Sequence, residues 1–370
     1  MSERDRAISV NSRIPDRVLA AYEQEPSRCR VNPLSGGLIN DTYRVDGGEV
    51  AWVLQRINSD VFPEPSRVMA NLRQLENHVA LQSTRAQGLS LPVIRKTLNG
   101  ADFMADDNGV IWRGLSLIPD ARNLSCISHR EEAVEVGRTL GWFHQLTETL
   151  DVGLLSDTLP GFHVAPGYLA DLDRWIERSP RISLLPAGLL QFIDQRRDRI
   201  GILESARSEG KLRLRVIHGD PKLDNVLFST GDARAVSIVD LDTVKPGLIH
   251  YDLGDCFRSS CNVSRGGGVS AQFDAQIFEA VLEGYLMEAG SSLTASDMEY
   301  LYPATWLLPF ELGIRFLSDH LAGDRYFKVC APGENLERAL RQFALLEDIE
   351  LQRSDLEASI AKARAQFKVG

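Results

Sequence analysis

The sequence predicts an α+β protein with two lobes, a small one built on an antiparallel sheet with one helix and a larger one that is mainly helical. Short apolar segments with Gly-rich breaks fill the first part of the chain and are typical of antiparallel strands. After about residue 125, apolar residues recur instead at helical spacing. The 370 residues suffice for two domains. We therefore expect an N-terminal lobe over residues 1–118, a hinge over 119–124 and a C-terminal lobe over 125–370.

The N-terminal lobe is expected to hold the strands of the sheet. The strand-like segments lie at residues 30–34, 40–46, 51–57, 91–94, 102–105 and 110–117. Between the third and the fourth, Pro65 opens a stretch in which Val68, Leu72 and Leu75 fall on one helical face. These elements predict an antiparallel sheet with one helix laid on it.

The C-terminal lobe is expected to be helical with one short interruption. The helical stretches lie at residues 130–146, 166–178, 187–207, 270–289, 296–320 and 334–366. Short strands interrupt them at residues 213–217, 226–229 and 235–239. The turn residues Thr230, Gly231 and Asp232 predict a hairpin between the last two strands.

Composition and charge exclude several classes of function. The formal net charge is −10, and such a surface would repel the phosphate backbone of a nucleic acid. We expect no membrane partner, because basic residues do not cluster and no apolar run approaches the roughly 20 residues of a membrane span. The opening residues 1–11 are charged and lack the apolar segment of a secretory signal, which predicts a cytoplasmic protein. The five scattered cysteines are expected to be reduced thiols.

Polar residues that could carry chemistry are concentrated in the interior strands. One block is the run His218-Gly219-Asp220-Pro221-Lys222-Leu223-Asp224-Asn225, and the other, Asp240-Leu241-Asp242, follows the apolar end of a later strand. Grouped carboxylates repel one another unless a cation or a proton offsets their charge. Carboxylate and amide oxygens suit Mg²⁺, and no Cys or His lies nearby at ligand spacing.

These two blocks resemble the catalytic centre of the kinase-like phosphotransferases, whose motif is H-x-D-x-K-x-x-N followed by a strand that ends in Asp. The spelling H-G-D is that of the small-molecule branch, which includes the aminoglycoside and choline kinases. The resemblance implies a bilobal protein-kinase-like fold and two cofactors, ATP and Mg²⁺. It implies that Asp220 accepts the proton of the acceptor hydroxyl and Lys222 neutralises the transferring phosphoryl group. Asn225 and Asp240 would hold Mg²⁺. Asp242 departs from the usual pattern, and whether it also touches metal stays open.

The small lobe carries the expected nucleotide site. Two glycines follow Ser35 in a hairpin between two strands, where glycine lets a backbone approach phosphates closely. The chain has no Walker A sequence. By resemblance, Arg56 stands where the family has its phosphate-binding cation, Glu76 would be its ion-pair partner, and residues 115–118 would pair with adenine. The expected nucleotide-binding residues are Ser35, Gly36, Gly37, Asn40, Thr42, Arg56, Glu76, Ser116 and Ile118.

A closer resemblance concerns the acceptor. The runs at residues 36–43, 54–58, 239–244, 314–317 and 323–328 are similar to the N-acetylhexosamine 1-kinases. Those enzymes phosphorylate the anomeric hydroxyl of N-acetylglucosamine or N-acetylgalactosamine. The resemblance implies that Arg315 and Tyr326 contact the sugar together with Asp220.

Alternatives remain open at this point. The acceptor could be another small alcohol, such as an aminoglycoside, choline, homoserine or methylthioribose, or the chain could be a nucleotide-binding pseudokinase. The sequence does not choose between a monomer and a homodimer. Asp252, in the helix expected after the second block, could cap that helix or hold the Asp220 loop by hydrogen bonds.

Overall fold

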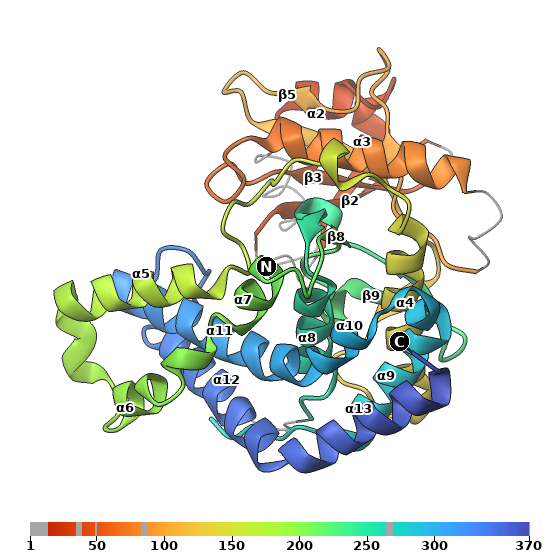
Figure 1. Ribbon diagram of the computed structural model, residues 1–370. Helices are drawn as coiled ribbons and strands as arrows, with labels where there is room; N and C mark the ends of the chain where they lie inside the picture. Colours follow the sequence, from red (N-terminus) through yellow and green to blue (C-terminus); the bar gives the residue numbers. More distant parts are fainter. Residues whose placement is uncertain (1–13, 35–38, 49, 83–87, 264–268, 370) are drawn as a thin grey trace.

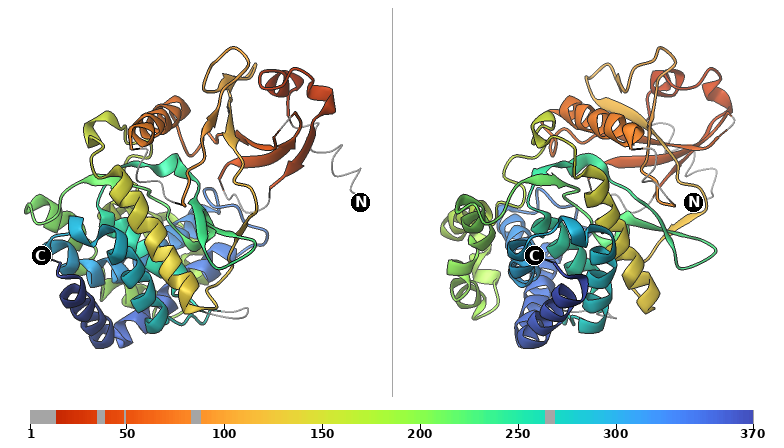
Figure 2. Two further views of the ribbon diagram at one scale, coloured as in Figure 1. Left: turned by 90° about the vertical axis from the view of Figure 1, so that its right-hand side faces the viewer. Right: turned by 45° about the vertical axis from the view of Figure 1, so that its right-hand side comes forward.

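The computed structural model describes residues 14–34, 39–48, 50–82, 88–263 and 269–369. Figure 1 shows a small lobe of strands and two helices above a larger lobe that is mainly helical. The two-lobed α+β architecture that the sequence predicts is therefore confirmed. Figure 2 shows the same division from two further sides.

The small lobe is built on an antiparallel sheet with the strand order β1-β2-β3-β6-β4, and β5 pairs with β6 at one side. Its strands are β1 (Arg30–Pro33), β2 (Asp41–Asp46), β3 (Trp52–Arg56), β4 (Ile94–Arg95), β5 (Met104–Ala105) and β6 (Ile111–Ser116). The predicted helix is α3 (Pro65–Leu81). A short helix that the sequence pattern did not predict, α2 (Asp16–Ala20), precedes β1.

Alternation along β3 divides this sheet into two faces. Trp52 and Leu54 are fully buried in a core cluster with Tyr22 and Trp112. The residue between Leu54 and Arg56 is Gln55, whose side chain points to the opposite face because successive side chains of a strand alternate. That opposite face is the one that meets α3 and the large lobe.

The chain leaves the small lobe after β6 and enters β7 (Ala121–Asn123). β7 pairs with β9 (Val226–Ser229), which in turn pairs with β10 (Ala235–Ile238). Part of the stretch that the sequence placed in the hinge is therefore a strand attached to the large lobe, and residues 117–120 alone lie between β6 and β7. A further pair, β8 (Arg215–Ile217) with β11 (Lys245–Gly247), contains a strand that the pattern missed.

Ten helices form the described part of the large lobe. They are α4 (Arg130–Thr147), α5 (Ala165–Arg178), α6 (Leu189–Asp194), α7 (Ile202–Ser208), α8 (Ile249–Ser260), α9 (Ala275–Ala289), α10 (Ala295–Glu299), α11 (Leu301–Ala322), α12 (Glu334–Leu351) and α13 (Arg353–Phe367). Three predicted helices are broken: residues 187–207 form α6 and α7, 296–320 span α10 and α11, and 334–366 form α12 and α13. None of the described helices is long and apolar enough to cross a membrane. All five cysteines are free thiols.

Helices α4 and α9 lie side by side at very short range (Figure 2). A Cβ atom on Gly137 would lie 1.9 Å from the carbonyl oxygen of Val281, and one on Gly284 would lie 2.0 Å from that of Val134. The crossing therefore requires glycine on both helices. It fixes the position of α4, whose His144 contacts Asp252 of α8.

Candidate active site

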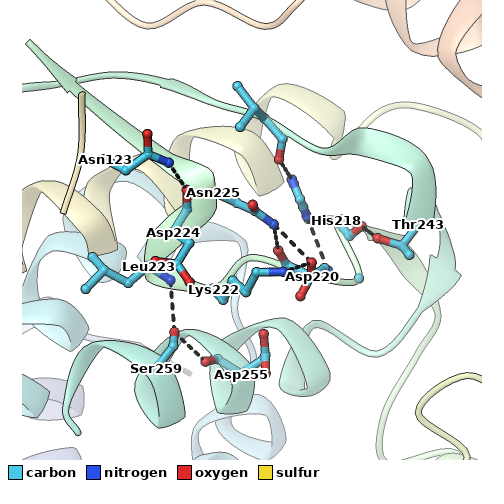
Figure 3. Close-up of polar contacts among 12 residues, drawn as sticks. Asn123, His218, Asp220, Lys222, Leu223, Asp224, Asn225, Thr243, Asp255 and Ser259 are labelled. Carbon is cyan, nitrogen blue, oxygen red and sulfur yellow. Dashed lines mark hydrogen bonds and ion pairs between the residues drawn. The ribbon is translucent and has the colours of Figure 1, made fainter. Parts of the chain in front are cut away.

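The predicted catalytic loop connects β8 to β9 through a short 3₁₀ turn, Leu223–Asn225 (Figure 3). His218 is fully buried, and one of its ring nitrogens lies 3.0 Å from the carbonyl oxygen of Val239. Gly219 has a φ of +86°, and a Cβ there would lie 2.6 Å from the carbonyl oxygen of Thr243. The loop therefore needs glycine before Asp220 for two reasons, its left-handed backbone and its close approach to the neighbouring segment.

Asp252, in the first turn of α8, holds this loop in place. Its carboxylate accepts the backbone N–H groups of His218 at 2.7 Å and Gly219 at 2.8 Å. On the far side it lies 2.8 Å from a ring nitrogen of His144, whose other nitrogen contacts the hydroxyl of Tyr285 at 2.9 Å. Of the two roles that the sequence left open for Asp252, the structure shows the second.

Replacing Asp252 with alanine is expected to destabilise the fold by about 3 kcal/mol or more, because it leaves two buried N–H donors and the His144 ring without their acceptor. Denaturant unfolding measures the loss. Asp274→Ala, which removes the N-cap of α9, should cost only about 1 kcal/mol. Equal losses in the two variants would contradict this role of Asp252.

Asp220, Lys222 and Asn225 converge within the loop (Figure 3). The ammonium of Lys222 donates to the carboxylate of Asp220, and the amide nitrogen of Asn225 donates to the carboxylate at 3.0 Å and to the carbonyl oxygen at 2.7 Å. Burial lowers the pKa of Lys222, but the charges of Asp220 and Asp240 outweigh it and the net shift is upward. Lys222 therefore stays charged beside the expected catalytic carboxylate.

Asp240 follows β10 in the left-handed conformation, with a φ of +68°. The backbone N–H of Val239 donates to the carbonyl oxygen of Asn225 at 2.9 Å, so the tip of β10 is attached to the loop. Burial, followed by the charges of Asp242 and Asp220, raises the pKa of Asp240 to about 7. Asp240 itself is exposed at the tip of β10, and the neighbouring carboxylates favour its protonated form when no cation is bound.

The residues present fit a magnesium ion. Asn225 uses its amide nitrogen within the loop, which leaves the amide oxygen available as a hard ligand, and its backbone is hydrogen-bonded to Val239, the residue before Asp240. The described residues hold no group of three or more His, Cys, Asp or Glu side chains that could bind a metal by themselves. A magnesium site does not need one, because Mg²⁺ commonly takes one or two protein oxygens and completes its shell with phosphates and water.

Asp242, two residues further on, contacts the small lobe rather than this pair. It is 3% exposed, its carboxylate accepts from Asn40 at 2.6 Å, and it forms an ion pair with Arg113, which is 1% exposed. The sequence reasoning missed Arg113. A single arginine inside the otherwise apolar strand at residues 110–117 was the signal that could have found it.

The expected nucleotide residues are only partly brought together. Ser35, Gly36 and Gly37 lie outside the described residues. The hydroxyl of Thr42 accepts from Gln55 at 3.0 Å, and the N–H of Ser116 is already used by the carbonyl oxygen of Val93. Within the described chain, the backbone of Ile118 makes no hydrogen bond and is available to a ligand.

The predicted ion pair between Arg56 and Glu76 is wrong. Arg56 is about half exposed and lies 3.5 Å from Asp41, its neighbour across the strand pair. Glu76 instead accepts from Arg73, one helical turn away, and from the backbone N–H of Ile94. The physical reason is alternation along β3: Arg56 and Gln55 point to opposite faces, and Gln55 is on the face that meets α3.

Arg315, on α11, lies in a cage of aromatic rings. Its guanidinium is 4.9 Å from the ring centre of Phe162, 5.1 Å from that of Tyr168 and 5.6 Å from that of Phe327. Burial opposes the charge, but Tyr168, Glu311, Tyr326 and Asp220 together raise the pKa of Arg315 above its ordinary value. The Arg315 side chain is 13% exposed and lies 3.9 Å from the carboxylate of Glu311, which is 1% exposed, so the cage holds a nearly buried cation with a buried anionic partner.

The loop that carries Tyr326 is fixed by Asp319, near the end of α11. The carboxylate accepts the N–H groups of Arg325 and Tyr326 at 2.8 Å and that of Phe327 at 2.9 Å. Tyr326 is 40% exposed, and its ring packs edge-on against Phe327. Tyr326 therefore lies next to Phe327, one of the rings around Arg315, and is itself partly exposed.

His163 connects this cage to the catalytic loop and was not predicted. One ring nitrogen lies 3.0 Å from a carboxylate oxygen of Glu311, and the other lies 2.9 Å from the carbonyl oxygen of Gly219. Burial lowers the pKa of His163, but the charge and hydrogen bond of Glu311 reverse the shift and raise it. A protonated imidazole can donate to both partners and so fixes Gly219 relative to α11.

The two lobes, the H-G-D loop held by Asp252 and the β9–β10 hairpin that ends at Asp240 together match the architecture of a kinase-like phosphotransferase. The chain belongs to the phosphotransferase enzyme family, whose model matches residues 30–290.

Solved structures agree on the fold. The chain is similar to a microcompartment-associated aminopropanol kinase, with 16% identity, a TM-score of 0.65 and coverage of 95% of this chain and 98% of that one. An aminoglycoside phosphotransferase from Alicyclobacillus acidocaldarius gives 16% identity, a TM-score of 0.61 and 96% coverage of both chains. Choline kinase from Cryptosporidium parvum gives 14% identity, a TM-score of 0.57 and coverage of 92% of this chain and 94% of that one.

Proposed function

We propose that this protein transfers the γ-phosphoryl group of ATP, in the presence of Mg²⁺, to a hydroxyl of a sugar. The acceptor that we favour is the anomeric 1-OH of an N-acetylhexosamine, N-acetylglucosamine or N-acetylgalactosamine. The observation that carries the choice of a sugar over an amino alcohol is the caged guanidinium of Arg315, whose partner Glu311 is connected through His163 to the Asp220 loop.

The charge of this cage separates the candidate acceptors. The named acceptors of the similar structures, aminopropanol, aminoglycosides and choline, carry amines or ammonium groups that are cationic near neutral pH. Glu311, 3.9 Å away, offsets part of the charge of the Arg315 guanidinium, but a cation brought against the guanidinium itself would be repelled, because charges interact strongly where water is excluded. A sugar bears no charge, and its hydroxyl and amide oxygens can accept hydrogen bonds from the guanidinium. The aromatic rings of the cage would also suit the apolar face of a pyranose.

The mechanism is mainly positioning and charge neutralisation. The Asp220 carboxylate orients the acceptor hydroxyl and takes its proton, while Asn225 holds that carboxylate through its amide nitrogen. The Lys222 ammonium lies against the same carboxylate and offsets negative charge that develops on the transferring group. Mg²⁺, held by Asn225 and Asp240, supplies neutralisation of the nucleotide's phosphates when it is bound.

A coupled ADP-release assay over a panel of acceptors tests the proposal. The panel contains N-acetylglucosamine, N-acetylgalactosamine, glucose and galactose on one side, and choline, ethanolamine, aminopropanol and an aminoglycoside on the other. We expect turnover with at least one N-acetylated sugar and none above background with the amines. Preference for an amine would overturn the sugar assignment, and no transfer to any hydroxyl compound despite Mg·ATP binding would favour a pseudokinase.

Replacing Arg315 with methionine is expected to raise the KM for the sugar about 10- to 100-fold, because a charged hydrogen bond to the acceptor is lost. The kcat should fall less, and amines should become weak acceptors. Arg199→Met is the matched control, since Arg199 also stacks on an aromatic ring, 4.2 Å from that of Trp306, but outside the cage. An unchanged KM in the Arg315 variant would remove Arg315 from the acceptor site.

A further inference from the structure

A row of polar side chains crosses the inner face of the small-lobe sheet. Thr42 on β2, Gln55 on β3 and Arg113 on β6 lie directly opposite one another in the strand register. The side-chain amide nitrogen of Gln55 donates to the hydroxyl of Thr42 at 3.0 Å. The side-chain amide oxygen of Gln55 accepts two hydrogen bonds from the Arg113 guanidinium, at 3.0 and 2.7 Å. Gln55 therefore sets the direction in which the guanidinium points.

The Arg113 guanidinium points from the sheet toward the large lobe. A terminal nitrogen of Arg113 forms an ion pair with Asp242, and the two side chains are 1% and 3% exposed. A buried pair of this kind holds its geometry strongly, because removal of one member leaves an uncompensated charge in a medium of low polarity. β3 presents no cation on this face, since Gln55 occupies the inward position. The sheet's buried cation comes from β6 instead.

Asp242 belongs to the 3₁₀ turn Leu241–Thr243, which starts directly after Asp240. Its second carboxylate oxygen accepts from Asn40 at 2.6 Å, and its carbonyl oxygen accepts from the hydroxyl of Thr158 at 3.0 Å. At the other end of the turn, the hydroxyl of Thr243 donates to the carbonyl oxygen of His218 at 2.7 Å. The turn is thus fastened to both lobes and to the catalytic loop.

We infer that Arg113 is a positioning residue of the metal site: through its ion pair with Asp242, directed by Gln55, it ties the small-lobe sheet to the turn that begins at Asp240. This inference rests on the proposed function only in that it takes Asp240 as the metal ligand. Without the pair, the turn loses its attachment to β6, and Asp240 is no longer held in the orientation that the bound ion requires. The consequence is a higher requirement for Mg²⁺ rather than a weaker hold on the acceptor.

Calorimetric titration of the full chain with ADP over a range of Mg²⁺ concentrations tests this inference without any acceptor. In Arg113→Met, we expect the Mg²⁺ concentration for half-maximal ADP binding to rise about tenfold or more. Arg113→Lys keeps the charge but not the two hydrogen bonds that Arg113 donates to Gln55, and it should restore part of the difference. Arg196→Met removes a partly buried ion pair with Glu350 in the large lobe, and it should lower stability without a change in Mg²⁺ requirement.

Two outcomes would overturn the inference. One is a wild-type Mg²⁺ requirement in Arg113→Met, and the other is an equal shift in Arg113→Met and Arg196→Met, which would indicate general destabilisation. Should Arg113→Met fail to fold, Asp242→Asn removes the charge at constant size, and we expect the same direction of change from it. Failure of the sugar panel would leave these results intact. ADP binding by the wild-type chain without any need for Mg²⁺ would overturn both this inference and the proposed mechanism.

Discussion

Replacing Asp220 with alanine is expected to lower turnover by about three to four orders of magnitude while Mg·ATP still binds. The variant loses the group that orients the acceptor hydroxyl and takes its proton, a contribution that reaches about 10⁴-fold in other enzymes. The nucleotide should be retained because the expected metal ligands, Asn225 and Asp240, are unchanged. ADP release measures the first effect, and calorimetry with ADP and Mg²⁺ measures the second.

The same loop offers a matched control for this experiment. Asp224 is also an aspartate, four residues further along, but its side chain is exposed and only its carbonyl oxygen is used, by Asn123. Asp224→Ala should therefore keep most of the activity. Near-normal turnover in the Asp220 variant, or an equal loss in both variants, would contradict the role assigned to Asp220.

The parts of the site that the sequence could predict are those held together by local chain geometry. Asp220, Lys222 and Asn225 occur within a single loop, and a loop of eight residues between two strands restricts where their side chains can lie. The loop lies next to the end of β10 because β9 and β10 form a hairpin, and the turn residues between these strands predict that hairpin from the sequence. Their chemical roles remain predictions until the variants are measured.

Contacts between the lobes could not be predicted in this way. Arg113 and Asp242 are 129 positions apart, and the sequence around each residue does not indicate that the two form a pair. The prediction that Arg56 pairs with Glu76 failed because it relied on a resemblance in position and not on the alternation of side chains along β3. A one-residue difference on a strand changes the face, and here it separates Gln55, on the face that meets α3, from Arg56, which pairs with Asp41 on the other face.

The broken helices show a second limit. Apolar residues continue at helical spacing through residues 334–366, yet the helix ends at Leu351 and a new one begins at Arg353. Between them the side chain of Gln352 donates to the carbonyl oxygen of Phe273, in the segment before α9. Apolar periodicity reports burial of a face and is insensitive to a break that tertiary hydrogen bonds stabilise.

Asp240→Asn is expected to weaken Mg²⁺-dependent ADP binding and turnover by about 10³-fold or more, because it removes the negatively charged carboxylate that would bind the metal ion. Asp232→Asn, on the exposed hairpin turn between β9 and β10, should leave both unchanged. Wild-type Mg²⁺ dependence in Asp240→Asn would exclude Asp240 as a ligand.

In the absence of metal, the stability of Asp240→Asn relative to the wild-type chain should increase with pH. The direction of this change follows from the pKa of Asp240. Burial raises that pKa from 3.8 to about 7, so between these values the folded chain binds a proton that the unfolded chain has released. The wild-type chain therefore loses stability as the pH rises from about 4 through 7, whereas asparagine does not titrate. In thermal unfolding with a chelator, the melting temperature of Asp240→Asn relative to wild type should increase from pH 5 to pH 8. Saturating Mg·ADP should stabilise the wild-type chain but not the variant. A pH-independent difference between the two chains would mean that Asp240 keeps an ordinary pKa and that the carboxylates around it do not favour its protonated form.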